Sequence, residues 1–142
     1  MKIYYREKSG GIEILRCFGI EGRVEIPGMI DDKLVISAAP YAFSSHMDEK
    51  EDLKNASLWE VSDGLEFGRE EHVLAGNDVE EIVFPYTLKE IGRYIFYGCG
   101  NLKKLEFSDS LMQIGCGAFT GCHALEKLTE HMEQGKKSGV KE

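Results

Sequence analysis

The sequence predicts an α/β repeat solenoid, in which short strands from successive repeats stack into a parallel sheet. The first observation is an internal repeat without gaps: residues 79–101 align with 102–124 at a constant offset of 23 residues, and such a period is typical of stacked repeats. The second is a strand pattern, apolar-x-x-apolar-x-apolar, at the start of each unit, and the third is glycine at matching positions. Because one unit cannot bury both of its apolar halves alone, neighbouring units must stack.

An irregular first repeat is predicted over residues 23–52. Residues 24–27 resemble 82–85, and residues 40–43 resemble 116–119. The alignment assigns three phenylalanines to equivalent interior positions: Phe43, Phe96 and Phe119. We expect truncation of the last of these to alanine to cost about 3–5 kcal/mol of unfolding free energy, as in other protein cores.

The middle of the chain, residues 53–78, is interpreted as either an acidic degenerate repeat or an insertion. Residues 53–58 carry the strand pattern, which would place Asn55 and Ser57 in the sheet. Residues 41–78 contain ten acidic and three basic side chains, which favours a solvated insertion.

The repeats at 79–101 and 102–124 are followed by a terminal strand and a polar tail over residues 125–142. Glu130 stands where the strand pattern requires an apolar residue, and the residues beyond it are mostly polar. We therefore expect the stack to end in this segment.

The run Ile-Gly-x-x-x-Phe-x-Gly-Cys-x-x-Leu occurs twice, starting at Ile91 and at Ile114. Together with residues 26–43 it resembles the BspA-like (treponemal) class of leucine-rich repeats. The resemblance implies a short right-handed stack with a parallel sheet on its concave face. It also implies that residues 1–22 form an N-terminal β-hairpin. The length of 142 residues fits a single leucine-rich-repeat domain over residues 1–142.

Charge and hydropathy exclude two classes of partner and indicate where the chain is located. The formal net charge is −8, and no cluster of Lys and Arg suggests a phosphate backbone, so no nucleic acid partner is expected. The N-terminus has neither a signal peptide nor a membrane span, so no membrane partner is expected. As written the chain is expected to be cytoplasmic, or on the cell surface if it is part of a longer protein.

The four cysteines fall into different environments. Cys99 and Cys122 occupy equivalent repeat positions and are expected to be buried packing residues. Cys116 takes the position of Arg93 in the preceding unit and is expected to face outward, while Cys17 has no spacing signal.

No metal, cofactor or catalytic residue is expected. A zinc set can be drawn from Cys116, Cys122, His123 and His131, but its spacing matches no familiar ligand pattern. Hydrolase motifs and phosphate-binding glycine loops are missing from the sequence as well.

The remaining functional candidates are strand residues that alternate with the buried ones and face outward. They are Arg23, Glu25, Glu81, Val83, Lys104 and Glu106. The sequence predicts a protein-protein interaction module that binds a protein partner through this face, although Glu81 and Lys104 could instead simply pair across adjacent strands. The alternative is a structural protein that forms a homodimer through the C-terminal end of the stack. A third hypothesis is a metal- or thiol-dependent enzyme that uses Cys116 and the histidines.

Overall fold

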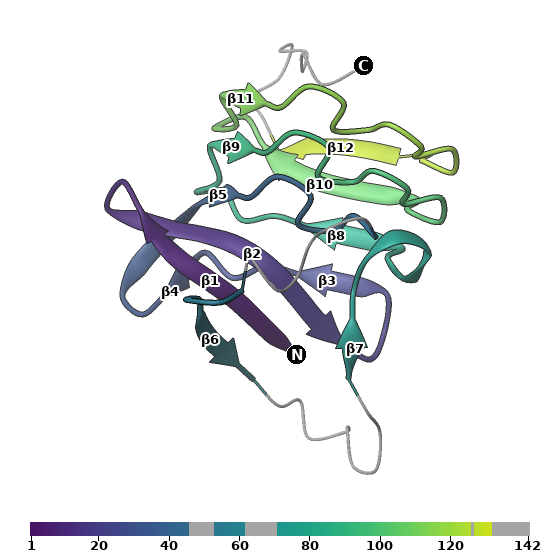
Figure 1. The fold of residues 1–142 in the computed structure, drawn as a ribbon. Helices are drawn as coiled ribbons and strands as arrows, with labels where there is room; N and C mark the ends of the chain where they lie inside the picture. Colours follow the sequence, from purple (N-terminus) through teal and green to yellow (C-terminus); the bar gives the residue numbers. More distant parts are fainter. Residues whose placement is uncertain (46–52, 62–70, 126, 132–142) are drawn as a thin grey trace.

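The computed structural model describes residues 1–45, 53–61 and 71–125, and the backbone of residues 127–131. The strands of these residues form two sheets (Figure 1), one with four strands and one with eight. Each repeat contributes one strand to either sheet, and the core lies between the two sheets.

The four-stranded sheet is parallel and has the order β12-β10-β8-β3. Its strands are β3 (Arg23–Glu25), β8 (Glu81–Val83), β10 (Lys104–Ser108) and β12 (Lys127–His131). Glu81 pairs with Lys104, and Lys104 pairs with Lys127, so the register follows the 23-residue period of the sequence. Alternate side chains of β3, β8 and β10 are buried, which confirms the predicted strand pattern.

The eight-stranded sheet combines repeat strands with N-terminal strands. Along its path lie β11 (Gln113–Ile114), β9 (Glu90–Ile91), β5 (Lys33–Ala38), β2 (Gly11–Gly19), β1 (Lys2–Lys8) and β6 (Ser57–Glu60). Two short strands lie off this path: β4 (Met29–Ile30) pairs with β5, and β7 (His72–Val73) pairs with β2. The repeat strands β5, β9 and β11 are parallel to one another, whereas β1 and β2 form an antiparallel hairpin.

A row of stacked phenylalanine rings runs through the core. The ring centroids of Phe43 and Phe96 are 6.0 Å apart, and those of Phe96 and Phe119 are 5.7 Å apart. The interplanar angles of 23° and 28° describe stacked rings. The alignment that placed these three residues in equivalent positions is therefore confirmed.

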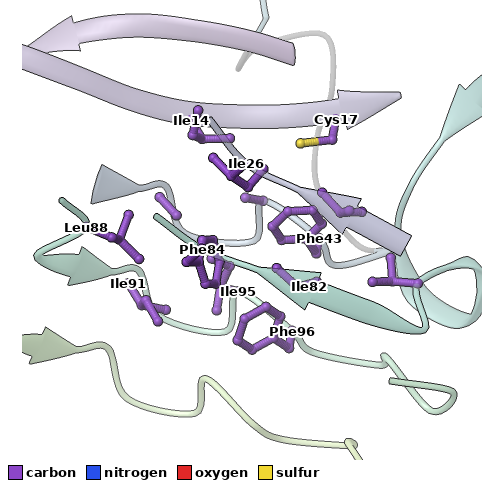
Figure 2. Packing of buried hydrophobic residues seen from close by; sticks show 14 of the residues in the cluster. Ile14, Cys17, Ile26, Phe43, Ile82, Phe84, Leu88, Ile91, Ile95 and Phe96 are labelled. Carbon is purple, nitrogen blue, oxygen red and sulfur yellow. The ribbon is translucent and has the colours of Figure 1, made fainter. Parts of the chain in front are cut away.

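The hairpin covers the N-terminal end of the stack. In Figure 2, Ile14 and Cys17 of β2 lie over Ile26 and Phe43 of the first repeat. In this region each repeat donates backbone N–H groups to carbonyls of the next repeat, so carbonyls of the first repeat have no preceding repeat to pair with. The buried Arg16 of β2 supplies donors there, 2.8 Å from the oxygen of Tyr41 and 3.1 Å from the oxygen of Ala42.

The helical part of the predicted α/β class is wrong for the described residues. They contain no α-helix, and the one helical segment is the 3-10 turn Gly76–Asp78. The segments between the sheets are instead tight turns held by short-range backbone hydrogen bonds. No helix in this part of the chain is long and apolar enough to cross a membrane.

The predicted strand at residues 53–58 is also wrong, because no segment lies between β3 and β8 in the four-stranded sheet. Ser57 belongs to β6, which pairs antiparallel with β1, and Asn55 lies in a turn. The segment does form a strand, but that strand pairs with the edge of the hairpin at β1 and not with a repeat strand.

The first repeat is instead interrupted and then completed. Gly76 N–H donates to the Phe43 oxygen at 2.9 Å, as Cys99 N–H does to Phe96 at 3.0 Å. The following turn is also the same in both repeats. Val79 N–H donates to the Gly76 oxygen at 3.3 Å, and Leu102 N–H donates to the Cys99 oxygen at 3.3 Å. The hydrogen-bond pattern of the first repeat thus stops after Phe43 and resumes at Gly76, which favours an insertion over a degenerate repeat.

Candidate functional site

Six outward residues predicted from the sequence lie together on one face of the four-stranded sheet. Strand register places Arg23, Glu81 and Lys104 in one row across β3, β8 and β10. A second row, two positions further along the same strands, contains Glu25, Val83 and Glu106. All six side chains are exposed or half-buried. We call this surface, defined by these six residues, the strand face.

Ion pairs connect the first row of the strand face. Arg23 Nε lies 3.0 Å from Glu81 Oε1, and Lys104 Nζ lies 3.8 Å from Glu81 Oε2. The cross-strand pair between Glu81 and Lys104 is therefore present, with a second cation on the other side of the carboxylate. Surface pairs of this kind contribute about 0–1 kcal/mol each, so they order the side chains without dominating stability.

The thiols of the repeat are packing groups, as predicted. Cys99 Sγ donates to the Phe43 oxygen at 3.3 Å, and Cys122 Sγ donates to the Phe96 oxygen at 3.4 Å. Burial raises the pKa of Cys99 to about 12 and that of Cys122 to about 11. Each thiol thus satisfies a carbonyl of the preceding repeat in its protonated form.

Native thiol reactivity should reflect this division. We expect Ellman's reagent to modify Cys116 quickly, because its side chain is exposed, while the other three of the four thiols react slowly. Burial also raises the pKa of Cys17 to about 12, and the thiolate is the reactive form. The fast phase should correspond to one thiol per chain and disappear in Cys116→Ser. A fast phase of two or more thiols would contradict the burial of Cys17 and Cys99 and the partial burial of Cys122.

The zinc set drawn from the sequence is not assembled. Cys116 faces solvent, while the Cys122 thiol is directed at a backbone oxygen. The His131 side chain lies outside the described residues. Among the residues whose side chains are described, no group of three or more His, Cys, Asp or Glu side chains could hold a metal ion.

A polar row on the eight-stranded sheet was missed from the sequence. Strand register aligns five residues across β1, β2, β5, β9 and β11, in the order Arg6, Glu13, Ser37, Glu90 and Gln113. We call these five residues the polar row. Ser37, Glu90 and Gln113 occupy one repeat position, but Arg6 and Glu13 belong to the hairpin and lie outside the sequence period.

Hydrogen bonds and ion pairs connect the polar row to Lys8. Glu13 is 1% exposed, accepts from Arg6 Nε at 2.7 Å and Lys8 Nζ at 3.2 Å, and lies 3.2 Å from Ser37 Oγ. Glu90 accepts from Lys8 Nζ at 3.0 Å and lies 3.1 Å from Ser37 Oγ, whose single proton is donated either to Glu13 or to Glu90. The hydrogen bond to Glu90 raises the pKa of Lys8, and the same bond lowers the pKa of Glu90. Both carboxylates of this network are thus held by cations.

Comparison with known proteins agrees with this architecture. Residues 70–136 match the family described as BspA type leucine rich repeat region (6 copies). The crystal structure of a T. pallidum leucine rich repeat protein (TpLRR) has a similar fold, with a TM-score of 0.50 and 16% identity. The similarity covers 92% of this chain and 80% of that chain. No curated protein matches the sequence. Residues 70–136 are therefore similar to BspA-type leucine-rich repeats, in agreement with the resemblance noted in the sequence.

Proposed function

We propose that this chain is a non-catalytic protein-protein interaction module that binds a protein partner through the strand face, as the concave surface of its stack. The observation that carries the proposal is the in-register alignment of β3, β8 and β10, which brings six outward side chains into two adjacent rows. Repeat solenoids commonly bind partners on such surfaces.

The dimensions of the strand face suit a narrow ligand. Parallel strands lie roughly 4.8 Å apart, so a four-stranded sheet is only about 15 Å across. An extended segment or a single loop of a partner fits this width better than a flat domain surface does.

The charges of the strand face suit a partner with a mixed charge pattern. Glu81 lies between Arg23 and Lys104 in the first row, and Val83 lies between Glu25 and Glu106 in the second. A complementary partner would place an acidic group near each cation and an apolar group near Val83. Such complementarity mainly provides specificity and faster association.

Exchange of one charge pair tests this role. The variant Glu81→Lys/Lys104→Glu keeps the net charge and an opposite-charge pair but changes the pattern of the strand face. Its matched control is Glu7→Lys/Lys33→Glu, which exchanges the ion pair between Lys33 Nζ and Glu7 Oε2, 3.4 Å apart, on the other sheet. In affinity capture from the source cells, a partner bound by wild type and control but lost from the first variant supports the proposal. Capture of the same partner by all three proteins would place binding elsewhere.

A second candidate, self-association through the C-terminal end, is favoured by a change in burial along the stack. Leu88, Ile91, Phe96 and Leu102 are buried, whereas their equivalents one repeat later are only partly buried. Those equivalents are Leu111, Ile114, Phe119 and Leu125. Met112, in the same last layer, is 79% exposed. Within the described residues, the core of the last repeat is therefore covered less than that of the repeat before it.

Light scattering distinguishes the second candidate from the first. A dimer that forms with increasing concentration and is lost in Met112→Asp would favour assembly through this end. Because Met112 is exposed, the substitution should leave the fold intact. A wild-type protein that stays monomeric at all accessible concentrations would eliminate this candidate.

A further inference from the structure

The eight-stranded sheet carries a recess of about 250 Å³ beside the polar row. The polar residues that line it are Lys8, Glu13, Ser37, Glu90, Arg93 and Gln113, and Gly92 and Gly115 line it as well. Ligand pockets for whole small molecules usually enclose about 300–1,000 Å³. The recess is therefore of a size for one functional group or a small acid rather than a cofactor.

The acceptor groups of the recess are already engaged. Glu13 accepts from Arg6 and Lys8, Glu90 accepts from Lys8, and the hydroxyl of Ser37 donates to one of the two carboxylates. A cationic ligand would have to compete with Lys8 for both carboxylates. A cation is thus an unsuitable occupant.

The donor groups of the recess retain capacity. No hydrogen bond or ion pair joins the Arg93 or Gln113 side chain to the rest of the described chain, and both residues are exposed and line the recess. Lys8 Nζ uses two contacts, to Glu13 and Glu90, and an ammonium group has three protons to donate. The unmet hydrogen-bonding capacity is therefore for an acceptor ligand.

The charge balance of the lining limits the charge of that acceptor. Lys8, Arg93 and Arg6, which pairs with Glu13, face the carboxylates of Glu13 and Glu90, so one further negative charge balances the group. A dianion such as phosphate would bring a second negative charge toward two fixed carboxylates. A monoanion adds only one negative charge, and it can lie beside the guanidinium of Arg93, which has no partner among the described residues. The planar guanidinium fork matches the two oxygens of a carboxylate.

We propose that this recess is a second binding site, separate from the strand face, and that it binds a carboxylate group through Arg93 and Gln113. Lys8, held in place by Glu13 and Glu90, contributes the remaining donor. The carboxylate can come from an acidic peptide side chain or from a free small carboxylic acid, since both present the same group.

Titration of the full ¹⁵N-labelled chain by NMR tests this site at physiological ionic strength, with tetraglutamate peptide, succinate and inorganic phosphate as separate probes. We expect the two carboxylate probes to cause saturable shifts at the amides of Gly92, Arg93, Gln113 and Gly115, and phosphate to cause none. A tighter complex with the peptide identifies an acidic segment as the source, and equal or tighter binding of succinate identifies a free acid.

Variants of the recess provide the control. Arg93→Gln should weaken carboxylate binding about tenfold or more, the effect of losing one charge-assisted contact. Lys103→Gln removes the same charge from an exposed position before β10 and should leave the affinity unchanged. Gln113→Ala serves as a second variant if Arg93→Gln alters the spectrum of the free protein. The proposal is overturned if neither carboxylate saturates, if phosphate binds as tightly, or if both recess variants bind like the wild type.

Discussion

Phe96→Ala should lower the free energy of unfolding by about 3–5 kcal/mol, the range found for truncation of large aromatic core residues. The Phe96 side chain is completely buried, and its ring lies between those of Phe43 and Phe119. It also contacts the ring of Phe84 at a centroid distance of 6.3 Å. Removal of the ring leaves a cavity in the middle of the stack that backbone turns on either side prevent from closing. Urea unfolding followed by circular dichroism measures the loss.

Phe119→Ala is the matched comparison. The sequence alone predicted the same large loss for Phe119, but the structure leaves that side chain partly exposed, with one stacked ring beside it in the described core. We now expect a loss of about 2 kcal/mol, in line with partial burial of an aromatic side chain. A loss for Phe96→Ala below about 1 kcal/mol, or one smaller than that for Phe119→Ala, would contradict the ring stack.

Gly92→Ala should cost about 3 kcal/mol or more, because overpacking against rigid backbone lies at the upper end of such effects. A Cβ atom at Gly92 would lie 2.6 Å from the Ala39 carbonyl carbon and 2.7 Å from Pro40 Cα. These are backbone atoms of the preceding repeat, so relief requires the two repeats to separate. Thermal and urea unfolding of the variant measure the effect.

Alanine variants of two other glycines distinguish the cost of a steric clash from the cost of an unfavourable backbone conformation. A Cβ at Gly28 would lie 3.6 Å from Pro85 Cβ, an ordinary contact, so Gly28→Ala should change stability by less than about 0.5 kcal/mol. Gly10 has a φ of +83°, and a Cβ atom there would meet no heavy atom within 4 Å. Gly10→Ala should therefore cost about 1–2 kcal/mol from left-handed strain alone. If Gly92→Ala costs no more than Gly10→Ala, the repeats are not packed as closely as the structure indicates.

The repeated glycines were predictable because each serves the same role in every copy. The sequence analysis noted glycine at matching positions, and the structure assigns two reasons to them. Gly98 and Gly121 have φ values of +82° and +86°, in turns that L side chains rarely adopt. Gly92 and Gly115 instead permit close backbone contact with the preceding repeat.

The strand face was predictable for a similar reason. Alternation within a strand determines which side chains face outward, and a constant period determines which of them become neighbours in the next strand. Glu81 and Lys104 are separated by one period and therefore pair across adjacent strands. Whether a partner binds them is a separate question, which depends on surface complementarity and not on the period.

The middle of the chain was not predictable in this way. Residues 53–58 satisfy the strand pattern, yet Ser57 pairs with Tyr5 of the hairpin and not with a repeat strand. A short apolar-alternating segment can pair with any open strand edge, so its pattern does not select one. The open edge of β1 is created only when the hairpin folds.

The sequence by itself determined the period, the strand register, the ring stack and the buried thiols, because in a stacked repeat one sequence offset defines every contact between neighbouring copies. The tertiary structure decided what lies outside the period. Arg16 satisfies carbonyls of the first repeat, and Glu13 meets Ser37 and, through Lys8, Glu90. These contacts join segments with no common pattern, and they form only because the hairpin packs on the end of the stack and extends its sheet.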